Sequence, residues 1–278
     1  MRQPIVAGKF YESDPEKLKK QLKEFFDSVP PDIKSNKLLA AIVPHAGYVY
    51  SGKCAAYFYK LLSQKKLPEL FIILGVNHSG TSDKALISIE NWKTPLGIIK
   101  VDKESASKLE SDFIKIDENS HKYEHSIEVQ LPFLQFITNK IKILPIILSS
   151  LDLDLAKKIA EKIFSIKKDF IVIVSSDFIH YGFNYNYTPF DSISEVKKLE
   201  QDIFDSICKI DYKKFISLIE KNQATVCGAS SILVLLELLK KLKSKNGKLI
   251  CNYNSGDIVH DYTNFVDYAS IIFEKWKY

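Results

Sequence analysis

Hydrophobic and polar positions along this chain follow two alternating patterns. Short, nearly continuous apolar runs are typical of strands buried on both faces of a sheet, and amphipathic segments with helical spacing separate them. The first helix is predicted where Ser13–Glu16 offers a capping oxygen, a proline for the first turn and a capping-box glutamate. Leu18, Leu22 and Phe25 then form its apolar stripe, and we expect the helix to end before Pro30.

The remaining pattern predicts an α/β protein. Strands are expected at 38–43, 70–74, 142–148, 170–174, 248–253 and 266–273, with two short strands within 85–101. Helices are expected at 53–62, 126–138, 153–166, 191–208, 211–221 and 229–243. This order predicts a mostly parallel or mixed central sheet with helices on both faces. Because no linker or repeat interrupts the pattern, we expect one domain over residues 1–278.

Composition narrows the function classes. The 278 residues are 46% hydrophobic, enough to bury a substantial core. The net charge is +5, but 39 basic and 34 acidic residues are interspersed, and no basic stripe with aromatic residues suggests nucleic-acid binding. The apolar runs are too short to span a bilayer, and no signal-peptide pattern is present. We therefore expect a cytoplasmic protein that binds neither nucleic acid nor membrane.

Three predicted strands lead directly into histidines. His45 follows LLAAIV, His78 follows LFIILGV, and FIVIV is followed by Asp177 and His180. Open α/β sheets bind ligands beyond the carboxyl ends of their strands, where neighbouring loops converge. The pattern therefore predicts a shared metal or substrate site at this edge.

Other polar residues leave alternatives open. Asp177 and His180 suit general acid–base work or ligand orientation, although Asp177 could instead cap a turn. His125 either opens a helix or faces the site, whereas His121 and His260 are expected at the surface.

The four cysteines are widely spaced, without a CxxC pair, and are expected to be reduced thiols. Cys227 immediately precedes a predicted helix, whose N-terminal dipole favours a thiolate that could bind metal or attack an electrophile. The competing interpretation is a small buried hydrophobic side chain. Cys54, Cys208 and Cys251 lie within apolar patterns and fit that simpler role.

Several longer stretches follow one another along the chain: RQPIVAGKFY, VPHAGYVYSG, ILGVNHSG, EHSIEVQLPFL, VSSDFIHYG, VCGASS and DYASIIF. Taken together and in this order, they resemble the motifs of the MEMO family. The resemblance implies a fold like that of class III extradiol dioxygenases and a metal pocket with His45, His78 and Cys227 as ligands. It further implies iron as the metal, with copper or zinc as alternatives, and an acid–base role for His180 beside Asp177 and His125.

The resemblance leaves two function classes open. One is a non-heme metal-dependent oxidoreductase, dioxygenase-like, acting on a small or peptide-borne substrate. Two histidines and a thiolate differ from the two-histidine, one-carboxylate set of ring-cleaving iron enzymes, so ordinary catechol cleavage is not expected. The other is a non-catalytic module that binds phosphorylated or acidic peptides in the same pocket. Archaeal relatives also imply a functional association with radical-SAM and AMMECR-type proteins.

Overall fold

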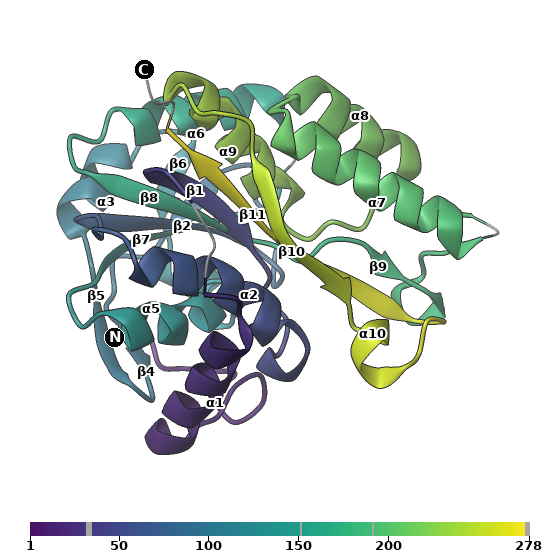
Figure 1. The fold of residues 1–278 in the computed structure, drawn as a ribbon. Helices are drawn as coiled ribbons and strands as arrows, with labels where there is room; N and C mark the ends of the chain where they lie inside the picture. Colours follow the sequence, from purple (N-terminus) through teal and green to yellow (C-terminus); the bar gives the residue numbers. More distant parts are fainter. Residues whose placement is uncertain (32–34, 151, 191, 276–278) are drawn as a thin grey trace.

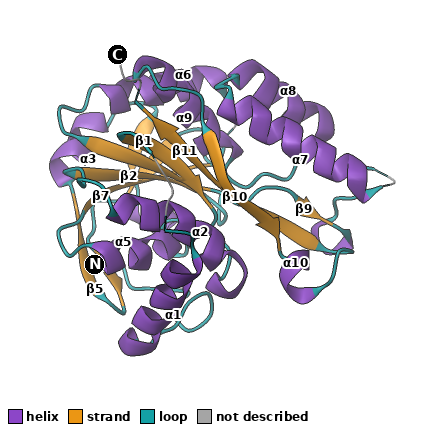
Figure 2. Cartoon of the chain, viewed as in Figure 1, coloured by secondary structure: helices purple, strands orange, loops and turns teal. Residues whose placement is uncertain are grey.

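The computed structural model describes residues 1–31, 35–150, 152–190 and 192–275. Within these residues an 11-stranded mixed sheet forms the centre, with helices on both of its faces (Figures 1 and 2). This arrangement confirms the predicted fold class.

The sheet is parallel at its centre and antiparallel toward both sides. Its main path runs in the order β10 (Lys248–Asn254), β11 (Phe265–Glu274), β1 (Leu38–Val43), β8 (Phe170–Ser175), β2 (Leu70–Val76), β7 (Lys142–Leu148), β3 (Ala85–Ile87) and β6 (Ile114–Ile116). β1, β8, β2 and β7 are mutually parallel, whereas β11 is antiparallel to β1. The carboxyl ends of β1, β8 and β2 therefore lie side by side at one edge.

Three shorter strands complete the sheet. β5 (Gly97–Val101) pairs in parallel with β7 and forms a hairpin with β4 (Trp92–Thr94). β9 (His180–Tyr181) pairs with the first residues of β11 and is not part of the strand order given above. This last pairing fixes the segment that follows β8 against the C-terminal strand.

Helices cover both faces and enclose two apolar clusters. α1 (Pro15–Ser28), α2 (Tyr48–Ser63) and α5 (Leu131–Ile137) cover one face; α6 (Leu153–Phe164), α7 (Ile193–Cys208), α8 (Tyr212–Asn222) and α9 (Ala229–Lys241) cover the other (Figure 1). In β1, Ala40 and Ile42 enter one cluster while Ala41 and Val43 enter the other. Burial of both faces explains why the strand sequences are continuously apolar. No helix in the described ranges is long and apolar enough to cross a membrane.

The predicted elements match the observed ones with a few differences. α2 begins at Tyr48, directly after Gly47, rather than near residue 53; the Tyr48 side chain is buried and donates a hydrogen bond to the Val129 carbonyl (2.6 Å). Residues 85–101 hold three strands instead of two. The predicted helix over 126–138 divides into a 3-10 turn at Glu128–Gln130 and α5. Residue 191, the first of another predicted helix, lies outside the described residues, and α7 begins at residue 193.

Several short elements were not predicted from the sequence. They are the helices α3 (Lys103–Leu109), α4 (Glu118–Lys122) and α10 (Gly256–Val259), a second 3-10 turn at Phe183–Tyr185, and the strands β6 and β9. Each is too short for a periodic pattern to be recognised.

His121 is buried, so its predicted surface position is wrong. Its Nε2 contacts the Leu86 carbonyl (3.0 Å), and Trp92 packs edge-on against the ring. Burial lowers the pKa of His121 to about 4, so the ring is neutral at neutral pH. His260 is exposed, as expected.

A buried ion pair fixes the N-terminal segment to the core. Arg2 Nη1 donates to Glu128 (2.8 Å), and Arg2 packs over the Trp92 ring. The same Glu128 carboxylate accepts hydrogen bonds from the backbone N–H groups of Ile5 and Val6 and from the Tyr11 hydroxyl (2.7 Å). Because Glu128 is completely buried, these partners replace water in stabilising its ionised carboxylate.

We predict that Arg2→Ala lowers the free energy of unfolding by about 3–5 kcal/mol, because it leaves the Glu128 carboxylate buried without its counter-charge. Urea denaturation would measure the loss. Lys19→Ala, which removes the exposed pair with Glu16, is the control and is expected to change stability by less than about 1 kcal/mol. Equal losses in the two variants would contradict the role assigned to Arg2.

Candidate metal centre

Three histidines meet beyond the carboxyl ends of β1 and β2. His45 follows β1, His78 follows β2, and His125 lies between α4 and the 3-10 turn. One ring nitrogen from each lies within 4.8 Å of the other two. The His78 and His125 rings stack with centroids 4.6 Å apart, and His45 meets His78 edge-on at 5.2 Å. Such a set of imidazole donors has the composition of a transition-metal site.

The Glu124 carboxylate orients His78. It accepts hydrogen bonds from the His78 backbone N–H (2.7 Å) and the Ser126 backbone N–H (2.7 Å), and it lies 3.0 Å from His78 Nδ1. Burial opposes ionisation, but these hydrogen bonds prevail and lower the pKa of Glu124 to about 2. An ionised Glu124 places the His78 proton on Nδ1 and leaves Nε2 free to bind a metal.

Hydrogen bonds also orient His45. The Ser175 hydroxyl donates to the Ser126 carbonyl (2.6 Å), so it accepts from Gln130 (2.8 Å) and from His45 Nδ1 (3.3 Å). This arrangement leaves Nε2 of His45 without a proton, 3.9 Å from Asp177 Oδ2.

Burial keeps two of the three imidazoles neutral. It lowers the pKa of His45, and it lowers the pKa of His125 to about 4 with the help of the neighbouring His45. Neutral imidazole is the form that binds metal ions. Burial therefore favours the neutral form of His45 and His125 that a metal ion requires.

Asp177 and His180 follow β8 and line the same cavity. Asp177 Oδ1 accepts hydrogen bonds from the backbone N–H groups of His45 (2.7 Å) and Ala46 (3.3 Å), which fixes the His45 loop. His180 Nδ1 lies 2.9 Å from the Phe178 carbonyl and 3.0 Å from the Thr225 carbonyl. Since both are acceptors, Nδ1 carries the proton and Nε2 is free to take another.

Cys227 lies in this cavity next to His180. Its Sγ is 3.5 Å from His180 Nε2, and Gly228 separates it from the start of α9. The sequence favoured a thiolate, but burial, with the charge of Asp177, raises the pKa of the Cys227 thiol well above its usual range. Desolvation therefore outweighs the helix dipole, and Cys227 is a protonated thiol in the absence of a metal.

The structure thus brings all six sequence-predicted site residues to one cavity of about 500 Å³: His45, His78, His125, Asp177, His180 and Cys227. It groups them differently from the sequence prediction, however. His125 lies beside His45 and His78, whereas Cys227 is next to His180. Among the described residues, the three histidines form the only compact group of potential metal ligands.

Sequence reasoning did not assign a role to Glu124. Its only signal was its place next to His125 in EHSIEVQ, which does not reveal the contact with His78, 46 residues away along the chain.

Comparison with known proteins agrees with the resemblance noted in the sequence. A model of the family described as Memo-like protein matches residues 2–272. The chain belongs to the Memo-like family. A MEMO1 family protein of Sulfolobus acidocaldarius is 40% identical over 98% of this chain and 99% of its own length. MEMO1 family proteins of Methanosarcina mazei and Methanosarcina barkeri are 39% and 37% identical, each over 99% of this chain and at least 99% of their own length. The Memo-like chain is therefore similar to these relatives along nearly its whole sequence.

We predict that Glu124→Gln weakens metal binding by about 10–100-fold, because an amide orients His78 less strongly than a carboxylate. Competition with a chelator would measure the affinity. Glu118→Gln is the control, since Glu118 likewise accepts hydrogen bonds from two backbone N–H groups, but its side-chain partner is the Ser88 hydroxyl and not a histidine. An unchanged affinity in Glu124→Gln would contradict the orienting role.

Proposed function

We propose that this protein is a metal-dependent oxidoreductase acting on a small or peptide-borne substrate. The observation that carries the proposal is the cluster of His45, His78 and His125, two of whose rings have Nε2 left free by hydrogen bonds at Nδ1. The donor set suits iron, copper or zinc, and we propose iron because the resemblance to the family implies it. When bound, such a metal supplies a Lewis acid and, in the case of iron or copper, a one-electron redox partner.

We assign the three histidines as the primary ligands and Cys227 as the fourth donor. The Cys227 thiol must lose its proton to bind a metal, and His180 Nε2, 3.5 Å from the sulfur, is placed to accept it. These contacts support a proton-transfer role for His180 at one atom, Nε2, while two carbonyls hold Nδ1. Asp177 acts by positioning, because its Oδ1 holds the backbone of the His45 loop.

A module that binds phosphorylated or acidic peptides is the less favoured alternative. Recognition of phosphate or carboxylate groups uses arginine and lysine side chains. The residues that line this cavity in the described part of the chain include neither, and they do include Asp177 and Asp261. The lining therefore supports the oxidoreductase proposal over an acidic-peptide module.

We predict that His45→Ala, His78→Ala and His125→Ala each weaken metal binding more than about a hundredfold, and that Cys227→Ser weakens it about tenfold because three imidazoles remain. Elemental analysis of anaerobically purified protein and chelator competition would measure both effects. His260→Ala, at an exposed histidine, is the control. If Cys227→Ser strips the metal while His125→Ala keeps it, the ligand set is His45, His78 and Cys227, as the sequence motifs imply.

We predict that His180→Ala leaves metal affinity within about tenfold but slows alkylation of Cys227 by iodoacetamide several-fold at pH 8, because the thiol loses its proton acceptor. Peptide mass analysis would report the labelling of each cysteine, and Cys208 serves as the internal control. A metal affinity as low as that of His45→Ala would instead place His180 among the ligands.

A further inference from the structure

The cavity that contains the histidines differs in the sign of its charged side chains from the net charge of the chain. The chain has a net charge of +5, yet the described residues lining this cavity include two carboxylates and no lysine or arginine. Asp177 is almost completely buried at the base, and Asp261 is exposed at the rim. The Asp261 carboxylate accepts hydrogen bonds from the Thr263 backbone N–H (2.8 Å) and hydroxyl (2.6 Å), which lower its pKa and keep it ionised.

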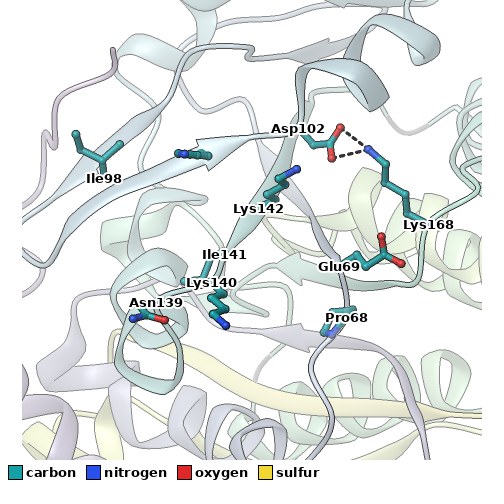
Figure 3. Close-up of a pocket in the computed structure, with 10 residues that line it drawn as sticks. Pro68, Glu69, Ile98, Asp102, Asn139, Lys140, Ile141, Lys142 and Lys168 are labelled. Atoms are coloured by element: carbon teal, nitrogen blue, oxygen red, sulfur yellow. Dashed lines mark hydrogen bonds and ion pairs between the residues drawn. The ribbon is translucent and has the colours of Figure 1, made fainter.

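Lysines gather instead in a separate cavity of about 540 Å³ at the opposite edge of the sheet (Figure 3). Lys140 and Lys142 lie where β7 begins, and Lys168 precedes β8, where it forms an ion pair with Asp102 (2.7 Å). The histidine cavity lies past the other ends of the parallel strands. The two cavities therefore present opposite charges at opposite edges.

Aromatic side chains form much of the wall of the histidine cavity. Tyr50 and Tyr185 are partly exposed on this wall, and Tyr268 is buried in it. The rings of Phe10 and His125 pack edge to face, with centroids 5.0 Å apart. Burial and the charge of Asp177 raise the pKa of both Tyr185 and Tyr268, so these hydroxyls stay protonated. Aromatic faces beside carboxylates attract cations and planar groups.

We infer that the substrate of this site carries a protonated amine on an aromatic or other planar body. This inference rests on the proposed function for the identity of the site, but its chemistry comes from Asp177, Asp261 and the tyrosines. The cavity volume of about 500 Å³ suits a molecule with one or two rings, or a single side chain of a peptide. The amine is attracted to the rim carboxylate and the aromatic faces, while the planar body fills the space beside His180.

Three probes of similar size and shape differ in charge, so they isolate the effect of charge on binding: 2-phenylethylamine, 2-phenylethanol and phenylacetate. Calorimetry at pH 7 and low salt is carried out first on metal-free protein, so that the carboxylate probe cannot coordinate a metal. We expect the amine to bind at least about tenfold more tightly than the alcohol, and the carboxylate to bind weakest. Added salt should reduce the difference between the amine and the alcohol.

Variants at the rim test which residues cause the preference. Asp261→Asn should reduce amine affinity about tenfold and leave alcohol affinity unchanged, whereas Asp154→Asn, at an exposed aspartate on α6, should change neither. Tyr185→Leu should weaken amine binding and Tyr185→Phe should preserve it, because phenylalanine keeps the aromatic face.

The possible outcomes distinguish this inference from the proposed function. If the metal-free wild type binds none of the probes, or binds phenylacetate as tightly as the amine, the inference is overturned, while the metal-binding results of the histidine variants stand. If the amine preference and its loss in Asp261→Asn are found but the histidine variants bind metal like the wild type, the substrate class holds and the metal-dependent function fails.

Discussion

The contact between the Glu124 carboxylate and His78 is the interaction on which the candidate site depends. A completely buried carboxylate is tolerated only where hydrogen bonds replace its hydration, and here His78 and Ser126 supply them from two different loops. Arg2 donates to the Glu124 carbonyl and to the Glu128 carboxylate, so the N-terminal segment braces the same loop. The positions of His78 and His125 are thus set by buried charge rather than by packing alone.

This dependence explains what the sequence could and could not predict. Each strand end that leads into His45, His78 or Asp177 is a local pattern of apolar residues followed by polar ones, so the fold class and the shared edge were predictable. The grouping of His125 with His45 and His78 depends on where the loop after α4 folds back, and the contacts that fix it join residues more than 40 positions apart. No periodic pattern encodes such contacts. The same holds for His121, whose burial follows from the position of Trp92 and Leu86.

Cys227 shows how two local effects compete. Its place before α9 was evident from the sequence, and a helix N-terminus alone would stabilise a thiolate. The depth of the cavity and the nearby charge of Asp177 act in the other direction and prevail. The outcome depends on the solvent exposure of one sulfur atom, which only the folded chain determines. A cation entering the cavity would reverse this balance, so the state of the thiol is coupled to the occupancy of the site.

The position of β11 has a consequence for how the protein is made. This strand, the most C-terminal of those described, lies between β10 and β1 in the sheet, and its first residues pair with the strand that carries His180. During synthesis, His45, His78 and His125 leave the ribosome long before residues 265–274. Until β11 emerges, one side of β1 has no strand to pair with, and the His180 segment lacks its anchor. The cavity is therefore completed only after residues 265–274 have emerged, and the nascent chain carries the histidines well before it has the walls around them.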